Sequence, residues 1–173
     1  MQGCLRLLNQ EDSQNFKKLR LESLLMDKDS WLSSLEEEKD QPDYFFSNKI
    51  TFAISAPIFG YWGYFENGQL LGYAQIAVSY WKKRMHIATI FDVCVTPSAR
   101  KKGVGNRILN FIIDKAKTSS NLEMLQLWVT SRNLEAIKFY EGLGFTKTAT
   151  NKKSVKETDG NYQDEYLYTL KLK

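Results

Sequence analysis

The spacing of apolar and polar residues along the chain predicts an alternation of strands and helices. Residues 4–9 form a short apolar stretch that is typical of a strand. Apolar positions then recur at helical spacing over residues 11–27, and a second helical pattern covers residues 29–39. From Phe52 onward the pattern changes to a two-residue period, which is the period of strands. We therefore expect one strand and two helices ahead of a β-rich centre.

The second half of the chain contains stronger signals. Asn67 and Gly68 stand between two β-rich runs and predict a hairpin over residues 61–81, because both turn positions tolerate positive φ. Apolar periodicity then predicts six further elements: a strand over 86–97, a helix over 104–117, a strand over 123–129, a helix over 133–144, and closing strands over 145–150 and 164–173.

The predicted order of elements is β-α-α-β-β-β-α-β-α-β-β. The strand–helix–strand–helix run over residues 86–143 is typical of a parallel crossover within a mixed sheet. A chain of 173 residues is long enough to bury one ordinary core. We therefore expect a single domain over residues 1–173, of the α/β or α+β class. Its ligand crevice is expected beside the carboxyl ends of the central strands.

Composition narrows the class of protein further. No apolar run reaches the roughly 18 residues that a membrane span needs. The net charge of +4 suits a small anionic ligand and falls short of a typical nucleic-acid binder. Cys4, Cys94 and the single His86 argue against a disulfide framework and against a metal site. Together with an N-terminus that lacks the pattern of a secretory signal, they predict a cytoplasmic protein.

The stretch PSARKKGVGNRIL, residues 97–109, concentrates positive charge and glycine where a helix is about to begin. A helix start leaves backbone N–H groups without intrahelical partners and carries partial positive charge. Glycines at 103 and 105 let an anion approach that backbone, and three consecutive cations stand beside it. The pattern favours a pyrophosphate cradle that is neither a P-loop nor a dinucleotide fingerprint. The alternative is a solvated basic turn whose glycines only fit the bend.

Two motifs carry a resemblance to a known family. Arg100-x-x-Gly103-x-Gly105, which follows a strand and opens a helix, resembles the R/Q-x-x-G-x-G/A motif of the GCN5-related N-acetyltransferases, abbreviated GNAT. The run WVTSRNLEAIKFYEGLGF, residues 128–145, is similar to that family's second conserved block. The resemblance implies a mixed, mostly antiparallel sheet, splayed at its central parallel strand pair and flanked by helices. It also implies direct acetyl transfer from acetyl coenzyme A (acetyl-CoA) to a primary amine, without a metal.

The resemblance implies a set of cofactor-binding residues. Backbone amides of the basic loop are expected to hold the pyrophosphate, and the strand before the loop is expected to pair with the pantetheine arm. The loop residues are Arg100, Lys101, Lys102, Gly103, Val104, Gly105 and Asn106, and the strand residues are Val93, Cys94 and Val95. Cys94 is interpreted as a buried structural residue rather than a nucleophile. Asn133 and Tyr140 are expected on one side of the following helix, with Asn133 as its cap, a ligand contact, or both.

The catalytic roles also follow from the resemblance. Tyr140 is the expected general acid, because a phenol can donate a proton to the departing thiolate. The backbone amide of Val93 is expected to polarise the thioester carbonyl. Asp92 is the candidate general base. It could also act through water, attract a cationic substrate or only hold a loop, because Phe91 stands where some polyamine-acetylating relatives carry glutamate.

The acceptor side is less defined by the sequence. Residues 44–66 contain nine of the 23 aromatic residues, and an aromatic-walled pocket with nearby acids favours a cationic amine. The polar stretch 151–165 is a candidate flap over that pocket. Two alternatives stay open: a non-catalytic sensor that binds acyl-CoA, and a nucleic-acid-binding domain that uses Lys82, Lys83, Arg84 and the basic cluster at residues 100–102. A homodimer is compatible with the sequence, but no residue demands one.

Overall fold

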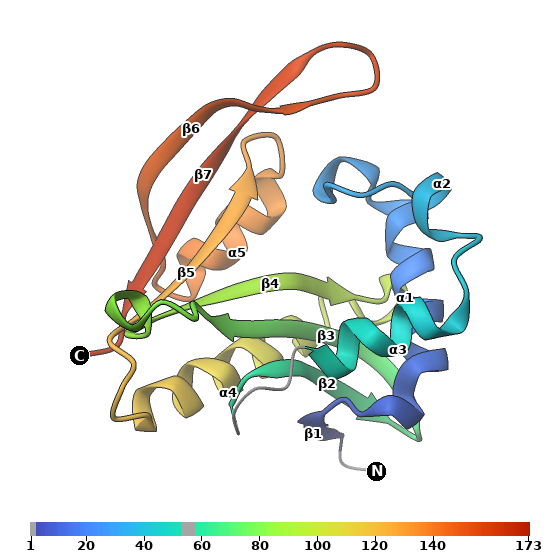
Figure 1. Cartoon of the computed structure of the whole chain (residues 1–173), viewed down its shortest axis with the longest axis horizontal. Helices are drawn as coiled ribbons and strands as arrows, with labels where there is room; N and C mark the ends of the chain where they lie inside the picture. The colour runs from blue at the N-terminus through green and yellow to red at the C-terminus, as the bar shows by residue number, and fades with distance from the viewer. Residues whose placement is uncertain (1–2, 53–57) are drawn as a thin grey trace.

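A seven-stranded mixed sheet organises the computed structural model, which describes residues 3–52 and 58–173 (Figure 1). Residues 1–2 and 53–57 of the predicted domain lie outside the described residues. The strand order is β1-β2-β3-β4-β5-β7-β6. The strands are β1 (Cys4–Leu7), β2 (Gly60–Glu66), β3 (Gln69–Val78), β4 (Ile87–Val95), β5 (Met124–Thr130), β6 (Thr146–Lys156) and β7 (Tyr162–Lys171). The helices are α1 (Ser13–Met26), α2 (Leu35–Glu38), α3 (Asp43–Phe52), α4 (Val104–Thr118) and α5 (Leu134–Gly142).

The sheet divides between β4 and β5. These two strands pair in parallel at three positions only, from Ile87 opposite Met124 to Thr89 opposite Gln126. Beyond them the strands diverge, as Figure 1 shows, whereas every other neighbouring pair is antiparallel. The predicted mixed sheet with a splayed parallel pair is therefore confirmed.

Two apolar clusters lie on the two faces of the sheet. One cluster contains the buried face of α4, represented by Ile108 and Ile112, with Ala88 and Leu125 of the central strands. The other contains Phe16 of α1 together with Phe46 and Ile50 of α3, and residues of β2 and β3. Because residues alternate between faces along a strand, β2, β3 and β4 each contribute to both clusters. The helices of the N-terminal part therefore cover the face opposite α4.

The structure corrects the sequence predictions in three places. The helix predicted over residues 29–39 is limited to the single turn α2, because Ser34 caps a new start there and Glu37 completes the capping box. Helix α3 was missed. The last hairpin is longer than predicted: β6 extends to Lys156, so most of the stretch proposed as a flap is paired with β7.

Strand β4 contains an irregularity at Asp92. The pairing with β3 shifts between Tyr73 and Gln75, so that one extra residue of β4 is accommodated. Asp92 has a φ of 48°, which is rare for a residue with a side chain. This β-bulge turns the Asp92 side chain toward the N-terminal helices. Among the described residues no helix is long and apolar enough to span a membrane.

Candidate active site

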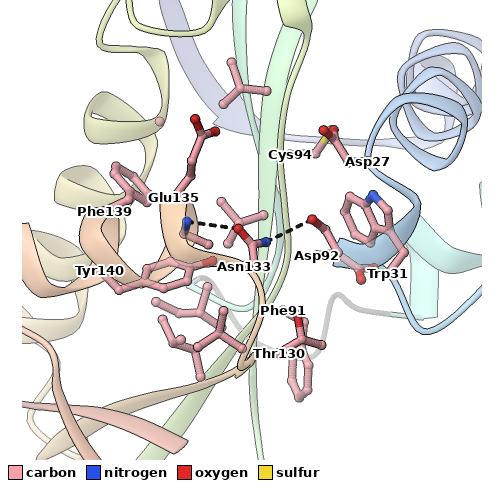
Figure 2. Close-up of a pocket in the computed structure, with 18 of the residues that line it drawn as sticks. Asp27, Trp31, Phe91, Asp92, Cys94, Thr130, Asn133, Glu135, Phe139 and Tyr140 are labelled. Atoms are coloured by element: carbon pink, nitrogen blue, oxygen red, sulfur yellow. Dashed lines mark hydrogen bonds between the residues drawn. The ribbon is translucent and has the colours of Figure 1, made fainter. Parts of the chain in front are cut away.

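A cavity of about 990 Å³ opens where β4 and β5 diverge. It is bounded by the loop before α4, by α5 and by the segment after α1 (Figure 2). Of the catalytic and cofactor-binding residues proposed from the sequence, all except Lys102 line it. The cavity brings together Asp92, Val93, Cys94, Val95, Arg100, Lys101, Gly103, Val104, Gly105, Asn106, Asn133 and Tyr140.

The loop before α4 presents unpaired backbone donors to the cavity. Within the described structure, no N–H group from Lys101 to Asn106 donates to a protein acceptor, and the first intrahelical bond runs from Arg107 N–H to Gly103 O at 3.0 Å. No side chain caps the helix. Lys101 and Gly103 have φ values of 59° and 81°. When successive residues alternate between right-handed and left-handed helical backbone conformations, their N–H groups point to one side and form a concavity that binds anions.

Arg100 does not offer a free charge to this concavity. Its Nη1 donates to Oδ1 of Asp27 at 3.0 Å, and its Nε donates to the backbone oxygen of Val95 at 3.1 Å. The hydrogen bond to Asp27 raises the pKa of Arg100 above its ordinary value. Arg100 therefore ties the loop to the end of α1. Lys101 and Lys138 are the lysines that line the cavity, and Lys138 was missed by sequence reasoning.

Gly105 allows α4 and α5 to approach each other closely. A Cβ atom at this position would lie 3.2 Å from Cζ of Phe139 and 3.7 Å from Cγ2 of Val95. A side chain here would press against the ring of Phe139, whereas its distance from Val95 would be that of an ordinary van der Waals contact. The second glycine of the motif thus keeps the loop and α5 in contact at the edge of the cavity.

Tyr140 lies on α5 with its ring buried. Its side chain packs against Phe139 and Phe145, with ring centroids 5.5 and 6.2 Å away. Burial raises the pKa of Tyr140 above its ordinary value, because the charged phenolate is poorly solvated there. No hydrogen bond to its hydroxyl is present within the described residues, and Figure 2 shows that hydroxyl directed toward the middle of the cavity. The phenol is therefore protonated and available.

Asn133 is the cap of α5. Its Oδ1 accepts from the N–H of Ala136 at 3.0 Å, and its Nδ2 donates to Oγ of Ser30 at 2.9 Å (Figure 2). The prediction of a helix cap is confirmed. The second bond links α5 to the segment after α1, so Asn133 also holds two walls of the cavity together.

Asp92 is held by two residues from the N-terminal half. Oδ2 accepts from the Tyr61 hydroxyl at 2.6 Å, and Oδ1 lies 3.7 Å from Nη1 of Arg20. Arg20 is itself buried and paired with Glu38 at 2.8 Å. Burial, with the adjacent Asp92 charge, raises the pKa of Tyr61 well above its ordinary value. The side chain of Asp92 is thus fixed at the cavity wall.

The edges of β4 and β5 that face each other are unpaired along the cavity. Pairing ends at Thr89 and Gln126, and beyond it the backbone of Ile90–Cys94 has no strand partner on that side among the described residues. An extended ligand can form hydrogen bonds with such an edge. Cys94 lies in this stretch, but its side chain is buried, and burial raises the pKa of its thiol to about 12. This agrees with the structural role predicted for Cys94.

Sequence reasoning missed several cavity residues on the acceptor side. They are Trp31 and Leu32 of the segment after α1 and Trp128 of β5. Asn151 of β6 and Glu165 of β7 also line the cavity, and they are the two ends of the stretch 151–165 that was proposed as a flap. The aromatic stretch 44–66, proposed for this wall, contributes none of the lining residues. Tyr61 and Phe46 are instead buried in the core, and the side chain of Phe52 lies outside the described residues. The register of the strands brings these residues to the cavity, and no local sequence pattern indicates that register.

Comparisons with known proteins agree with this geometry. A family model described as "Acetyltransferase (GNAT) family" matches residues 20–145. The chain is 34% identical over 90 residues to the UPF0157 protein YqkA of Bacillus subtilis, covering 52% of this chain and 24% of that protein. It is also 30% identical over 107 residues to the [Ribosomal protein bS18]-alanine N-acetyltransferase of Escherichia coli, covering 62% of this chain and 68% of that enzyme.

A solved structure supports the fold. The structure of yncA from Salmonella typhimurium with its cofactor acetyl-CoA superposes with a TM-score of 0.79 at 19% identity, covering 100% of this chain and 95% of that one. At this identity the likeness is one of fold. Because the family model covers more than half of the sequence, as the motifs at residues 100–105 and 128–145 predicted, the chain belongs to the GNAT family of acetyltransferases.

Proposed function

We propose that this protein transfers the acetyl group of acetyl-CoA directly to a primary amine of a small molecule, peptide or protein. One observation carries the proposal. The unpaired N–H groups of Lys101 and of residues 103–106, the open edge of β4 and the hydroxyl of Tyr140 line a single cavity. The N–H groups can bind an anion, the edge of β4 can form hydrogen bonds with an extended ligand, and the hydroxyl can donate a proton. The name of the E. coli relative, which specifies an alanine of a ribosomal protein, supports an amine acceptor.

The donor would be held by the main chain rather than by particular side chains. Loop residues Lys101 to Asn106 would bind its pyrophosphate, with Lys101 and Lys138 supplying the nearby positive charge. Val93, Cys94 and Val95 would pair with its pantetheine arm. When bound, acetyl-CoA supplies an activated acyl group as a thioester. Arg100 and Asn133 contribute by holding the walls in place, as their bonds to Asp27 and Ser30 support.

In the reaction a C–N bond forms and the C–S bond breaks, the amine releases a proton to solvent water, and the departing thiolate gains a proton. We propose that the thiolate takes its proton from the Tyr140 hydroxyl, which is protonated at neutral pH. Within the described structure, no protein group is hydrogen-bonded to this hydroxyl. The backbone N–H of Val93 would polarise the carbonyl, since its strand edge is open. Asp92 would chiefly fix the bulge, because Tyr61 and Arg20 already engage its oxygens.

A thiol-release assay tests the proposal. Purified protein with acetyl-CoA and a panel of primary amines is expected to release free coenzyme A, and mass spectrometry is expected to find a 1:1 acetylated product. Binding of acetyl-CoA without turnover on any amine would favour the acyl-CoA sensor instead. Steeply salt-dependent binding to nucleic acid, without binding to acetyl-CoA, would favour the third alternative.

The cellular setting is part of the same proposal. Cys4 and Cys94 are both free thiols, which supports a reducing compartment and hence the cytoplasm. We retain the homodimer as a proposal as well. Sedimentation of the purified protein tests it, and localisation of a tagged chain in the cell tests the compartment.

A further inference from the structure

We infer that the acceptor is a primary amine attached to a bulky apolar group and lacking a carboxylate, recognised by Phe91, Trp128 and Glu165. The inference rests on the proposed function and names the substrate class of the same site. Its basis is the face of the sheet on which these three side chains lie.

Phe91 and Trp128 occupy equivalent positions on the two diverging strands. Thr89 of β4 is paired with Gln126 of β5, and Gln126 Nε2 donates to Thr89 Oγ1 at 2.9 Å, so these two side chains share one face. Phe91 and Trp128 each follow two residues later. Because alternate residues of a strand point to the same face, both aromatic side chains lie on that face, one on each side of the opening.

This face is opposite the one covered by α4. The intervening residues Ile90 and Leu127 are buried in the cluster with α4. Phe91 and Trp128 are 45% and 43% exposed as whole residues, and Leu32, from the segment after α1, is 75% exposed. All three line the cavity. Three large apolar side chains left exposed around one cavity indicate a site that is covered by an apolar ligand.

Glu165 adds a negative charge to the same face. It pairs with Thr130 of β5 and with Asn151 of β6 in register, and Thr130 is two residues beyond Trp128. Glu165 is partly buried and lines the cavity, and its carboxylate has no hydrogen bond or ion pair within the described residues. By contrast, the carboxylates of Asp92 and Asp27 in the same cavity are already engaged.

The remaining carboxylate of the lining, Glu135, belongs to another part of the cavity. It lies on the first turn of α5, on the far side of Asn133 from Phe91 in Figure 2. Glu165 is therefore the carboxylate that lies on the same face of the sheet as Phe91 and Trp128. Such an arrangement attracts a protonated amine whose hydrocarbon part covers Phe91 and Trp128, and it repels an acceptor with a carboxylate beside the amine.

The test compares acceptors that differ in one group. Thiol release from acetyl-CoA is followed with 2-phenylethylamine, ethylamine, phenylalaninamide and phenylalanine. We expect 2-phenylethylamine to exceed ethylamine in kcat/KM by roughly tenfold or more, the scale of apolar-pocket discrimination. Phenylalaninamide is expected to exceed phenylalanine by a similar factor. If no acceptor at all supports release, the proposed function fails; if release occurs with equal rates across either pair, this inference fails.

Single-residue variants test which side chains determine the preference for an apolar amine without a carboxylate. Trp128→Ala is expected to raise KM for 2-phenylethylamine and leave that for ethylamine unchanged, with Trp81→Ala as the control because Trp81 is exposed outside the cavity. Glu165→Gln is expected to raise KM for amines, to narrow the gap between phenylalaninamide and phenylalanine, and to leave the pH profile of kcat unchanged. Glu123→Gln is its control, because Glu123 is exposed and does not line the cavity. A changed pH profile, or equal effects of variant and control, would overturn the assignment.

Discussion

The hydroxyl of Tyr61 donates a 2.6 Å hydrogen bond to Oδ2 of Asp92, which joins β2 to the bulge of β4 across the intervening β3. Tyr61 is buried, and its partner carries a charge. The bond therefore fixes the side chain of Asp92 and the bulge next to Val93, the residue whose backbone amide we propose polarises the thioester.

Tyr61→Phe tests this anchoring. Loss of a buried hydrogen bond to a charged group is expected to lower the free energy of unfolding by about 1.5–3 kcal/mol. It is also expected to lower kcat, because the bulge loses its tether. Urea unfolding and steady-state kinetics measure the two effects. An unchanged kcat in this variant would show that the hydrogen bond from Tyr61 to Asp92 does not contribute to catalysis.

Asp92→Asn asks whether Asp92 is a base. The amide oxygen of asparagine can still accept from Tyr61, so we expect a stable protein with a moderately lowered kcat and an unchanged shape of the pH–rate profile. Kinetics from pH 6 to about 10 provide the measurement. Loss of an ionisation from the profile would restore Asp92 as the general base.

Gly103 and Gly68 form a matched pair. Both have positive φ, 81° and 76°, and a Cβ atom at either would meet nothing within 4 Å. Replacement of each by alanine is expected to cost a similar stability, about 1 kcal/mol or more. Only Gly103→Ala is expected to weaken acetyl-CoA binding, because only its φ orients the unpaired N–H groups. Calorimetry with acetyl-CoA compares them, and equal affinities would count against the cradle.

Tyr140→Phe keeps the ring and removes the proton donor. We expect kcat to fall by about 10²-fold or more, with little change in KM for acetyl-CoA, since the packing against Phe139 and Phe145 is retained. Single-turnover measurements separate chemistry from product release. An unchanged single-turnover rate would remove Tyr140 from the proposed role.

The pH dependence of the wild type has a defined sign. Burial raises the pKa of Tyr140 above its ordinary value of about 10, so the phenol keeps its proton as pH rises through the alkaline range. We therefore expect no loss of kcat between pH 7 and about 10 from this group. A decline below pH 9 that disappears in Tyr140→Phe would contradict the assignment.

The two cysteines are expected to differ in reactivity. Cys4 is exposed, whereas Cys94 is buried and burial raises the pKa of its thiol to about 12. Since the thiolate is the reactive form, a thiol reagent at pH 8 is expected to modify Cys4 rapidly and Cys94 only after unfolding. Cys94→Ala is expected to keep most activity. Rapid labelling of Cys94 in the folded protein would show that the strand opens.

The sequence predicted the parts of the fold that have strong local signals. The Asn67-Gly68 hairpin and the start of α4 at Gly103 were predicted because each needs a particular backbone conformation. Helix α3 was missed because Phe46 and Ile50 are its fully buried apolar residues, while exposed Tyr44 obscures the period. The far part of β6 was missed because its residues are nearly all exposed and show no alternation.

The candidate site was predicted where main-chain geometry determines it and missed where long-range packing does. The loop at 101–106 is one continuous segment with its glycines visible in the sequence. The pairing of Arg100 with Asp27 joins residues 73 positions apart, and no local pattern contains it. The same holds for the positive φ of Asp92, which depends on the register between β3 and β4.

The short parallel contact between β4 and β5 has a consequence for turnover. Because only three residue pairs join the two halves of the sheet there, the diverging strands leave room for an extended ligand between them. In the proposed reaction, coenzyme A would occupy this space both as the acetylated donor and as the free product. We therefore expect the contacts that bind the donor to slow the release of free coenzyme A as well.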